Sequence, residues 1–259
     1  MVQAKKSLGQ NFLHNEGVIL DIVDAVASFE SNSVLEVGPG EGALTKHLYK
    51  KFDNFKAVEL DHRLIEYLPK QFPGLKLIHS DFLKFDVNKA FDGPFIVAGN
   101  FPYNISSQIL FKIVDHKELI PGMVGMFQKE VADRVGANFG NKQYGVISVL
   151  IQLYYHVEDV VDVGPENFRP APKVWSKVIK LVRKPEEDFG VSYQEIRSVV
   201  KAAFSQRRKV LNNALKPMLP GYEGGNEFID SILRKRAEAL SVENFVELTR
   251  QIKSLKGVG

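Results

Sequence analysis

The stretch Ser33-Val34-Leu35-Glu36-Val37-Gly38-Pro39-Gly40-Glu41-Gly42 decides the fold that we expect. Its first five residues form a short, mostly apolar run that predicts a strand, and a helix is expected over residues 43–51. The glycines between them let the backbone turn sharply and approach a ligand with no Cβ in the way. The stretch therefore predicts a strand, a tight turn and a helix, with a ligand at the turn.

The alternation of strands and helices continues on both sides of this stretch. Helices are expected at 15–29, 64–70 and 106–114, and strands at 55–59, 75–79, 94–99 and 123–127. Such alternation indicates a parallel sheet with helices on both faces. Helical segments at 131–135 and 146–153 then precede two β-rich runs, 155–161 and 173–182, which we interpret as an antiparallel pair on the sheet edge.

The C-terminal part has a different pattern. Beyond a candidate linker at 184–188 the periodicity is wholly helical, with helices expected at 193–204, 209–215, 228–240 and 242–255. We therefore expect an α/β domain over residues 1–184, including an N-terminal arm, and a small all-helical domain over residues 185–259.

Composition limits the classes of function. The chain has 259 residues, of which 44% are hydrophobic and 25% charged, as in a globular protein. No apolar run approaches the roughly 18 residues of a membrane helix, and no signal peptide is evident, so we expect a cytoplasmic protein. The absence of cysteine excludes disulfides, thiolate catalysis and Cys-based zinc sites. The whole chain has a net charge of +3, and residues 190–259 alone carry 12 Lys/Arg and 7 Asp/Glu. This basic C-terminal part favours an anionic partner, with nucleic acid ahead of membrane.

Acidic residues at successive strand ends point to an adenosine-containing cofactor. Glu59 closes the second strand 21 residues after Gly38, where its carboxylate can accept both hydroxyls of a ribose. Asp81 follows the third strand and can bond an adenine amine. NAD(P) and S-adenosylmethionine both fit this description, and Gly38, Gly40 and Ala43 match the looser dinucleotide fingerprint. Glu36 and the extra Gly42 fit a methyltransferase loop better.

The fourth strand end carries Asn100-Phe101-Pro102-Tyr103. These residues can form an ordinary turn with a packed Tyr. They also suit the binding of a flat, polar ring, since the amide reads the edge of the ring, the Pro fixes the backbone and the Tyr covers one face. The strand ends of an open α/β sheet line one crevice, which favours the second interpretation.

The wider motif resembles a known family. Gly99-Asn100-Phe101-Pro102-Tyr103-Asn104-Ile105-Ser106 is similar to the signature of rRNA adenine dimethyltransferases, and three further stretches match the same family: Lys6 to Leu13, Gln128 to Val131 and Phe168 to Val174. The resemblance runs from residue 5 to about residue 215 and is strongest to the bacterial small-subunit enzymes, the KsgA family. It implies a Rossmann-like class I methyltransferase with a mostly parallel seven-stranded sheet.

The resemblance also implies residue roles. Asn100, Phe101, Pro102 and Tyr103 would form the catalytic motif, and Tyr103 and Phe168 would stack on the two faces of a flipped-out adenine. The expected binders of S-adenosylmethionine are Asn11, Leu13, Gly38, Gly40, Glu59, Asp81, Phe82 and Asn100. Phe101 departs from the family, which usually has Leu there. We expect little change in chemistry, because the main-chain carbonyl is what counts at that position.

The expected mechanism uses positioning and no acid or base. The exocyclic nitrogen of adenine is a poor nucleophile, because its lone pair is delocalised into the ring. Hydrogen bonds from its N–H groups to the Asn100 side-chain oxygen and the Phe101 carbonyl would localise that lone pair and aim it at the methyl group of the sulfonium. No metal is expected, since none of the six histidines forms a metal-ligand pair at a recognisable spacing.

Two stretches without acidic residues, 169–184 and 197–216, are candidates for phosphate contacts. Each contains six basic residues. A solvated helix face is the usual explanation of a charge run, but a neighbouring base pocket favours RNA binding. The RNA-binding residues that we expect are Arg169, Lys173, Arg207, Arg208 and Lys209. The expected partner is small-subunit rRNA, with two adjacent adenines in a hairpin near its 3′ end methylated by a monomeric enzyme, within an assembling subunit.

Three alternatives remain open from the sequence. The first is the related antibiotic-resistance methyltransferase, which acts on large-subunit rRNA. The 205–209 and 168–174 stretches argue against it. A non-catalytic RNA-binding factor of ribosome assembly would not need an intact Asn100–Tyr103 motif. A dehydrogenase would leave that motif without a role.

Overall fold

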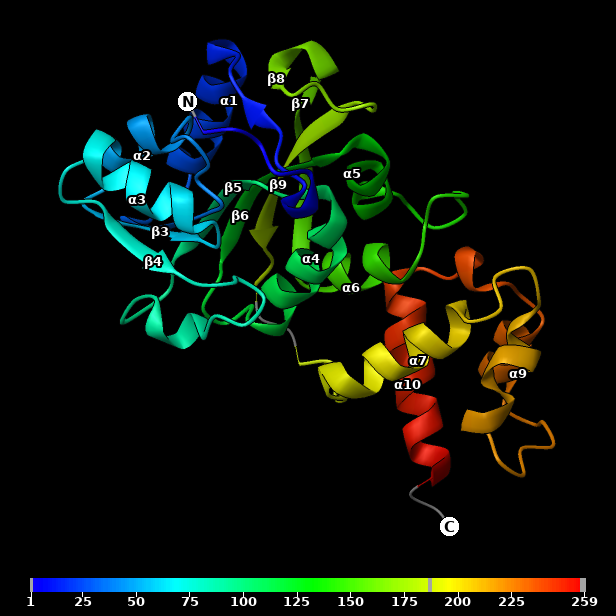
Figure 1. Cartoon of the computed structure of the whole chain (residues 1–259). Helices are drawn as coiled ribbons and strands as arrows, with labels where there is room; N and C mark the ends of the chain where they lie inside the picture. Colours follow the sequence, from blue (N-terminus) through cyan, green and yellow to red (C-terminus); the bar gives the residue numbers. More distant parts are fainter. Residues whose placement is uncertain (1, 186–187, 257–259) are drawn as a thin grey trace. The chain divides into compact units, whose positions relative to one another are not determined.

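In a computed structural model (Figure 1), the described residues are 2–185 and 188–256. They divide into two compact units: residues up to Asp133 with Tyr155–Arg183, and Arg134–Tyr154 with the chain from Lys184 onward. The domain division that we expected, at 184/185, stays a prediction, and the two units differ from it in the placing of residues 134–154. Residues 186–187 of the candidate linker lie outside the described residues. Within the described ranges we find no helix with both the length and the apolar character that a membrane span requires.

The first unit is built on a seven-stranded sheet with the order β4-β3-β2-β5-β6-β9-β7. The first five strands in this order are parallel, and β9 pairs antiparallel with both β6 and β7. The strands are β2 (Ser33–Val37), β3 (Asn54–Glu59), β4 (Lys76–His79), β5 (Ile96–Asn100), β6 (Gly122–Gln128), β7 (Tyr155–Val163) and β9 (Ser176–Arg183). The expected mostly parallel sheet, with an antiparallel pair at its edge, is confirmed.

The strand order places a topological switch point between β2 and β5. The chain steps outward from β2 to β3 and β4 through α2 (Thr45–Lys51) and α3 (His62–Gln71), and in the opposite direction from β5 to β6 through α4 (Ser106–Asp115). Since such crossovers are right-handed, α2 and α3 lie on one face of the sheet and α4 on the other. Ligands of open α/β sheets bind beyond the carboxyl ends of the strands at this point. The Gly38 loop and Asn100 therefore meet there.

The first helix, α1 (Glu16–Ala27), closes the same face as α2 and α3. Its buried residues are Val18, Ile19, Ile22, Val23 and Val26, the apolar set expected from helical spacing. They belong to one core cluster with residues of α2, α3 and the sheet. Asn15 caps the helix by accepting hydrogen bonds from the backbone N–H groups of Gly17 and Val18. The expected helix over 15–29 is confirmed, with ends shorter by one and two residues.

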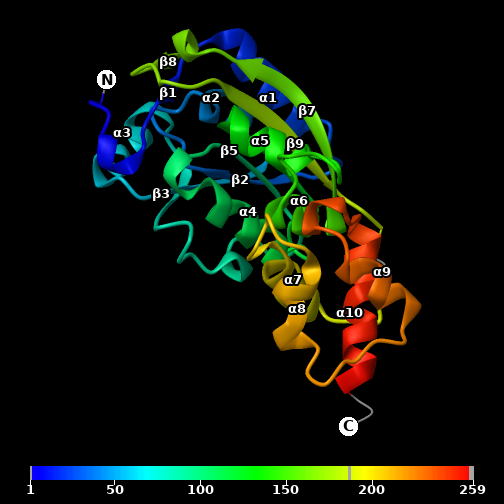
Figure 2. The ribbon, with the colours of Figure 1, turned by 90° about the vertical axis from the view of Figure 1, so that its right-hand side faces the viewer.

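A two-stranded ribbon that the sequence did not predict ties the N-terminal arm to the loop before β9. In Figure 2, β1 (Phe12–Leu13) and β8 (Phe168–Arg169) lie side by side. They pair antiparallel, with Phe12 opposite Arg169 and Leu13 opposite Phe168. A pairing of two residues leaves no periodicity to read. The short helices of this unit are η1 (Lys6–Leu8), η2 (Val87–Lys89), η3 (Tyr103–Ile105) and η4 (Pro165–Asn167).

The second unit is helical, as expected. Its helices are α6 (Val146–Tyr154), α7 (Tyr193–Phe204), α8 (Leu211–Leu215), η5 (Lys216–Met218), α9 (Glu227–Leu233), η6 (Ala237–Ala239) and α10 (Val242–Lys256). α5 (Lys129–Gly136) spans the boundary between the units. A capping box of Ser192 and Glu195 starts α7, and the Phe204 and Phe245 rings stack with centroids 5.8 Å apart.

The prediction of one helix over 228–240 is wrong. α9 ends at Leu233, and Arg236 has an extended backbone before η6. The backbone N–H of Leu211 donates to the Lys235 carbonyl at 2.8 Å. This bond joins two segments that are distant in the sequence, so the local pattern cannot reveal it.

Candidate active site

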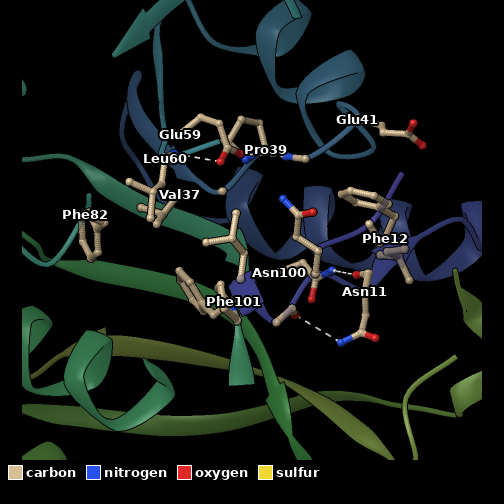
Figure 3. A pocket seen from close by; sticks show the side chains of 18 of the residues that line it. Asn11, Phe12, Val37, Pro39, Glu41, Glu59, Leu60, Phe82, Asn100 and Phe101 are labelled. Atoms are coloured by element: carbon tan, nitrogen blue, oxygen red, sulfur yellow. Dashed lines mark hydrogen bonds between the residues drawn. The ribbon is translucent and has the colours of Figure 1, made fainter. Parts of the chain in front are cut away.

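A cavity of about 490 Å³ lies at the switch point of the first unit. It is lined by the carboxyl ends of β2, β3 and β5, the loop after β4, and the N-terminal arm (Figure 3). Among its lining residues are the predicted cofactor binders Asn11, Leu13, Gly38, Gly40, Glu59, Asp81, Phe82 and Asn100. The structure therefore brings together residues from positions 11 to 100 of the chain.

The loop after β2 leaves room for a ligand. Gly38 and Gly40 have φ angles of +69° and +57°, a region that side chains rarely adopt. A Cβ at Gly38 would have no atom within 4 Å, so that any side chain there would project into unoccupied space. At Gly40 a Cβ would lie 3.0 Å from the Phe12 ring. The first glycine thus keeps the cavity open, and the second lets the arm close against the loop.

Glu59 presents a fixed carboxylate at the end of β3. One oxygen accepts the backbone N–H groups of Leu60 and Asp61, both at 2.8 Å, and the other accepts that of Gly40 at 3.4 Å. Burial raises the pKa of Glu59, and these three backbone donors oppose the rise. The carboxylate is held against the glycine loop, and the oxygen with the single, longer bond keeps a lone pair that a ribose hydroxyl can use.

The neighbouring carboxyl group, Glu36 on β2, has a different environment. It is 1% exposed and accepts the Thr45 hydroxyl at 2.7 Å. Burial raises the pKa of Glu36 to about 8, while the Thr45 hydrogen bond opposes the rise and the charge of Glu59 adds to it. A pKa of about 8 favours a proton on Glu36 at neutral pH. Burial raises the pKa of Glu59 as well, but its three backbone donors limit that rise.

The raised pKa of Glu36 should make the folding stability of the protein depend on pH. Between the unfolded pKa of 4.5 and the folded pKa of about 8, the folded state binds a proton that the unfolded state has released. Stability contributed by the protonated group therefore falls as pH rises through this window, by at most about 1.4 kcal/mol per pH unit. Glu36→Gln has no proton to release and can still accept from Thr45. It is expected to become more stable relative to the wild type as pH rises from 5 to 8. Urea unfolding of the ligand-free proteins at both values measures this.

The control for that measurement is Asp21→Asn, an exposed carboxyl on α1. It is expected to shift the unfolding midpoint equally at both pH values. Parallel pH profiles for the wild type and Glu36→Gln would show that Glu36 is ionised in the folded protein.

Apolar side chains flank the acidic residues. Leu60 is 48% exposed, a high value for Leu, and lines the cavity with Val37 and Phe82 (Figure 3). Asp81 accepts the backbone N–H of Leu83 at 2.9 Å, which fixes the turn after β4. Since a purine needs apolar cover on its faces and a polar group at its edge, this part of the cavity suits an adenine ring.

Asn100 is oriented by the N-terminal arm. Its side-chain NH₂ donates to the backbone carbonyl of Asn11 at 2.9 Å (Figure 3). Because a carbonyl can only accept, this bond assigns the amide orientation and leaves the Asn100 side-chain oxygen to accept from a substrate. The arm is thus part of the site.

The arm itself is held by Asp61, the N-cap of α3. Asp61 accepts from the Gln10 side chain at 3.0 Å and from the Arg63 Nε at 3.0 Å, and lies 3.6 Å from the Lys5 ammonium. Hydrogen bonding from Arg63 holds the pKa of Asp61 well below its usual range, against the effect of burial and with help from Gln10. Arg63 also donates to the Gln3 carbonyl.

Phe101 is a core residue below the site. It is 1% exposed, and its ring centroid lies 5.0 Å from that of Phe127. Gly99 and Gly125 stand opposite each other in the β5–β6 register and make room for this ring. A Cβ at Gly125 would lie 2.3 Å from the Phe101 ring, and one at Gly99 would lie 2.6 Å from the Val37 carbonyl oxygen. The two glycines thus let Phe101 pack without displacing the carbonyl after Asn100.

Tyr103 is anchored at its far end. Its hydroxyl forms a 2.6 Å hydrogen bond with that of Ser176, which is fully buried at the start of β9. Burial raises the pKa of Tyr103, with Ser176 opposing, so that the phenol stays neutral at ordinary pH. Tyr103 lines the cavity together with Pro102.

Comparison with known proteins identifies the family. A sequence model described as ribosomal RNA adenine dimethylase matches residues 1–253. The chain belongs to the ribosomal RNA adenine dimethylase family. Ribosomal RNA small subunit methyltransferase A of Bacteroides fragilis is 46% identical over 97% of this chain and 93% of its own, and that of Cytophaga hutchinsonii is 47% identical over 97% and 98%.

Solved structures agree with this family. A dimethyladenosine transferase from Plasmodium falciparum has a TM-score of 0.81 and 27% identity, and covers 95% of this chain and 98% of its own. The 23S rRNA methyltransferase ErmE has a TM-score of 0.73 at 22% identity, over 94% of this chain and 100% of its own, and supports the fold alone. The class I methyltransferase fold expected from the sequence is confirmed.

The surroundings of Phe168 and Arg207 do not favour the base and RNA contacts predicted for them. Phe168 is 3% exposed, belongs to the core cluster and is not among the cavity-lining residues, so its stacking on a base stays a prediction that its position does not support. Arg207 is exposed but donates to the Lys142 and Tyr144 carbonyls at 2.9 and 2.8 Å, which indicates a structural role within the second unit. The other four predicted RNA contacts are exposed: Arg169, Lys173, Arg208 and Lys209.

Sequence reasoning also missed residues that complete the site. Phe12 lines the cavity from the arm, and Leu60 flanks Glu59. Leu60 could have been predicted, because it directly follows Glu59 at the end of a strand. Ser176 bonds the Tyr103 hydroxyl, and Gly125 leaves room for the Phe101 ring because it has no side chain. Both relations join segments distant in the sequence, which no local pattern shows.

Proposed function

We propose that this protein transfers methyl groups from S-adenosylmethionine to the N6 amine of adenosines in small-subunit rRNA, giving N6,N6-dimethyladenosine. The observation that carries the proposal is the Asn100 amide, held by Asn11 with its oxygen available inside a cavity that suits an adenosine cofactor. The relatives that share 46–47% of its residues are named for methylation of small-subunit rRNA.

The residues present fit S-adenosylmethionine. Glu59 would accept the ribose hydroxyls, Asp81 would face the adenine edge, and Leu60 and Phe82 would cover the ring. The open space at Gly38 suits the methionine end, which the arm would cover. When bound, the cofactor supplies an electrophilic methyl group.

The chain's own part in the reaction is to bind and orient the target amine. The Asn100 oxygen and the Phe101 carbonyl would accept its two N–H groups, which localises the nitrogen lone pair and aims it. Tyr103, fixed at its hydroxyl by Ser176, would hold the adenine ring by stacking. Positioning and local electrostatics of this kind account for large rate effects without proton transfer by the enzyme.

Labelled methyl transfer to separated ribosomal subunits tests the proposal. Small and large subunits lacking the modification are incubated with the protein and S-adenosylmethionine labelled in its methyl group. Label is expected in small-subunit rRNA only, with two methyl groups for each modified adenosine. Label in large-subunit rRNA would favour the antibiotic-resistance activity, and no label in either would favour a non-catalytic assembly factor.

The target nucleotides and the substrate particle can be proposed in more detail. We infer that the targets are two adjacent adenosines in a hairpin near the 3′ end, methylated in an assembling small subunit by a cytoplasmic monomer. The acid-free stretch 197–216 of the second unit supports an RNA partner.

Arg208 and Lys209 are exposed basic residues of that stretch, and they test the RNA contact. We expect Arg208→Ala with Lys209→Ala to weaken rRNA binding several-fold at about 0.1 M salt. The slope of log affinity against log salt should become shallower by about 0.7 for each phosphate that is no longer neutralised. Lys70→Ala with Lys76→Ala, two exposed lysines of the first unit, is the matched control. An unchanged slope in the Arg208 and Lys209 variant would show that these residues are solvated and do not contact RNA phosphates.

A further inference from the structure

Val174 and Trp175, immediately before β9, expose large apolar side chains to solvent. Val174 is 44% exposed and Trp175 54%. Trp175 is the only tryptophan in the chain. Single exposed apolar residues are ordinary, but an adjacent pair that includes the largest side chain is a small apolar surface with an energetic cost in water.

Backbone pairing fixes Trp175 immediately before the residue that anchors Tyr103. The Trp175 carbonyl accepts the Lys129 N–H at 2.9 Å, and the next residue, Ser176, stands opposite both Gln128 of β6 and Val163 of β7. The Ser176 hydroxyl in turn bonds that of Tyr103 at 2.6 Å. Trp175 is therefore one residue from the group that anchors the ring expected to stack on the target adenine.

The charge of the loop that carries Trp175 favours an anionic partner. Arg169 and Lys173 are both exposed, and no acidic residue occurs from 169 to 184. Arg169 and Pro170 line the cavity, so that the loop continues from the cavity rim to Trp175. An exposed aromatic ring beside basic residues is an arrangement by which proteins bind single-stranded nucleic acid, since the ring stacks on a base and the cations contact phosphates.

Three aspartates near the start of β9 are paired with two lysines of the same unit. Lys177 lies 2.7 Å from a carboxylate oxygen of Asp133 and 2.6 Å from one of Asp159. Lys129 lies 2.9 Å from a carboxylate oxygen of Asp162. The three carboxylates and two ammonium groups leave a net charge of −1. The exposed Arg169 and Lys173 carry +2, so these residues together keep a positive charge of +1.

We propose that Trp175 is a stacking platform for an unpaired base of the RNA loop that contains the target adenosine. The proposal rests on the proposed function and adds a second base contact to it. Trp175 would hold a neighbouring nucleotide while Tyr103 holds the target, which fixes the direction in which the strand enters the site. Phe168, the aromatic residue that we expected to stack, is 3% exposed, and the exposed part of the loop begins at Arg169.

The single tryptophan allows a direct test on the unmodified full-length protein. The probe is an RNA hairpin with unpaired adenosines in its loop, and the matched control is the same hairpin with abasic sites in the loop. Stacking on a base is expected to quench the Trp175 emission with the first hairpin and to leave it nearly unchanged with the second, although both carry the same phosphates. Equal quenching by the two hairpins, or none by either, would overturn the proposal.

Variants measure the size of the effect. Trp175→Ala is expected to weaken binding of the labelled adenosine hairpin, followed by anisotropy, by about 5- to 150-fold, the range that corresponds to one base stack. Trp175→Phe should recover part of that affinity. Leu20→Ala, an exposed apolar residue of α1, should leave the affinity unchanged.

Methyl transfer separates this proposal from the proposed function. Trp175→Ala should raise the KM for the RNA substrate and leave kcat within a few fold. An unchanged KM with normal methylation would refute the platform alone. Absence of methylation by the wild type would refute the proposed function.

Discussion

Replacing Asn100 by alanine is expected to lower the rate of methyl transfer by two to three orders of magnitude or more. The variant lacks the side-chain oxygen that the Asn11 carbonyl holds available for the substrate amine. Removal of one preorganised hydrogen-bonding group at a reacting centre commonly has an effect of this size. Cofactor affinity should change by less than about tenfold, because Glu59 and the glycine loop remain in place.

The two quantities are measured separately. Single-turnover methylation of small subunits gives the rate, and calorimetry with S-adenosylmethionine gives the affinity. Asn88→Ala, an exposed residue of η2, is the matched control and should change neither. Full dimethylation by Asn100→Ala would show that the amide does not orient the amine.

Gly125→Ala is expected to have the second largest effect, although Gly125 is not among the cavity-lining residues. Its Cβ would lie 2.3 Å from the Phe101 ring, which is 1% exposed and packed on Phe127. Overpacking of this kind costs about 1–3 kcal/mol of stability. Since the ring cannot move freely, the Phe101 backbone should shift, and a misplaced carbonyl should lower kcat by about 10- to 100-fold.

A second substitution distinguishes this cause from general damage. Phe101→Leu removes the ring atom nearest to the new Cβ, although Phe127 Cε2 stays 2.9 Å away. The double variant with Gly125→Ala should therefore recover part of the kcat. Phe101→Leu alone should retain activity. Rates and urea unfolding of the four proteins give a double-mutant cycle. If the two substitutions were additive in kcat, Gly125 would not act through Phe101.

The cofactor half of the site was largely predictable from the sequence. Parallel strands place their carboxyl ends along one edge, so the Gly38 loop, Glu59, Asp81 and Asn100 could be assigned to one crevice from strand order alone. All four line the cavity. This inference needs only the rhythm of strands and helices.

The aromatic residues on the substrate side were not predictable in the same way. Successive side chains of a strand point to opposite faces, so a difference of one residue in register decides which ring is buried. Phe168 stands opposite Leu13 and is buried, whereas Phe12 lines the cavity and Trp175 is exposed. The two-residue ribbon that sets this register has no signal in the sequence.

Charge alone was also an incomplete guide. Arg207 and Arg208 are adjacent, equally basic and both exposed, yet the Arg207 guanidinium donates to two backbone carbonyls. Those carbonyls belong to residues more than sixty positions earlier, Lys142 and Tyr144. Only the folded second unit separates the structural arginine from the candidate phosphate contact.

The identity of the methylated nucleoside tests directly whether the protein dimethylates adenosine. Small-subunit rRNA lacking the modification is incubated with the protein and S-adenosylmethionine, digested to nucleosides and analysed by mass spectrometry. We expect N6,N6-dimethyladenosine from the wild type and none above background from Asn100→Ala. Unmodified adenosine after treatment with the wild type, or methylation at a ring nitrogen or ribose hydroxyl, would contradict it.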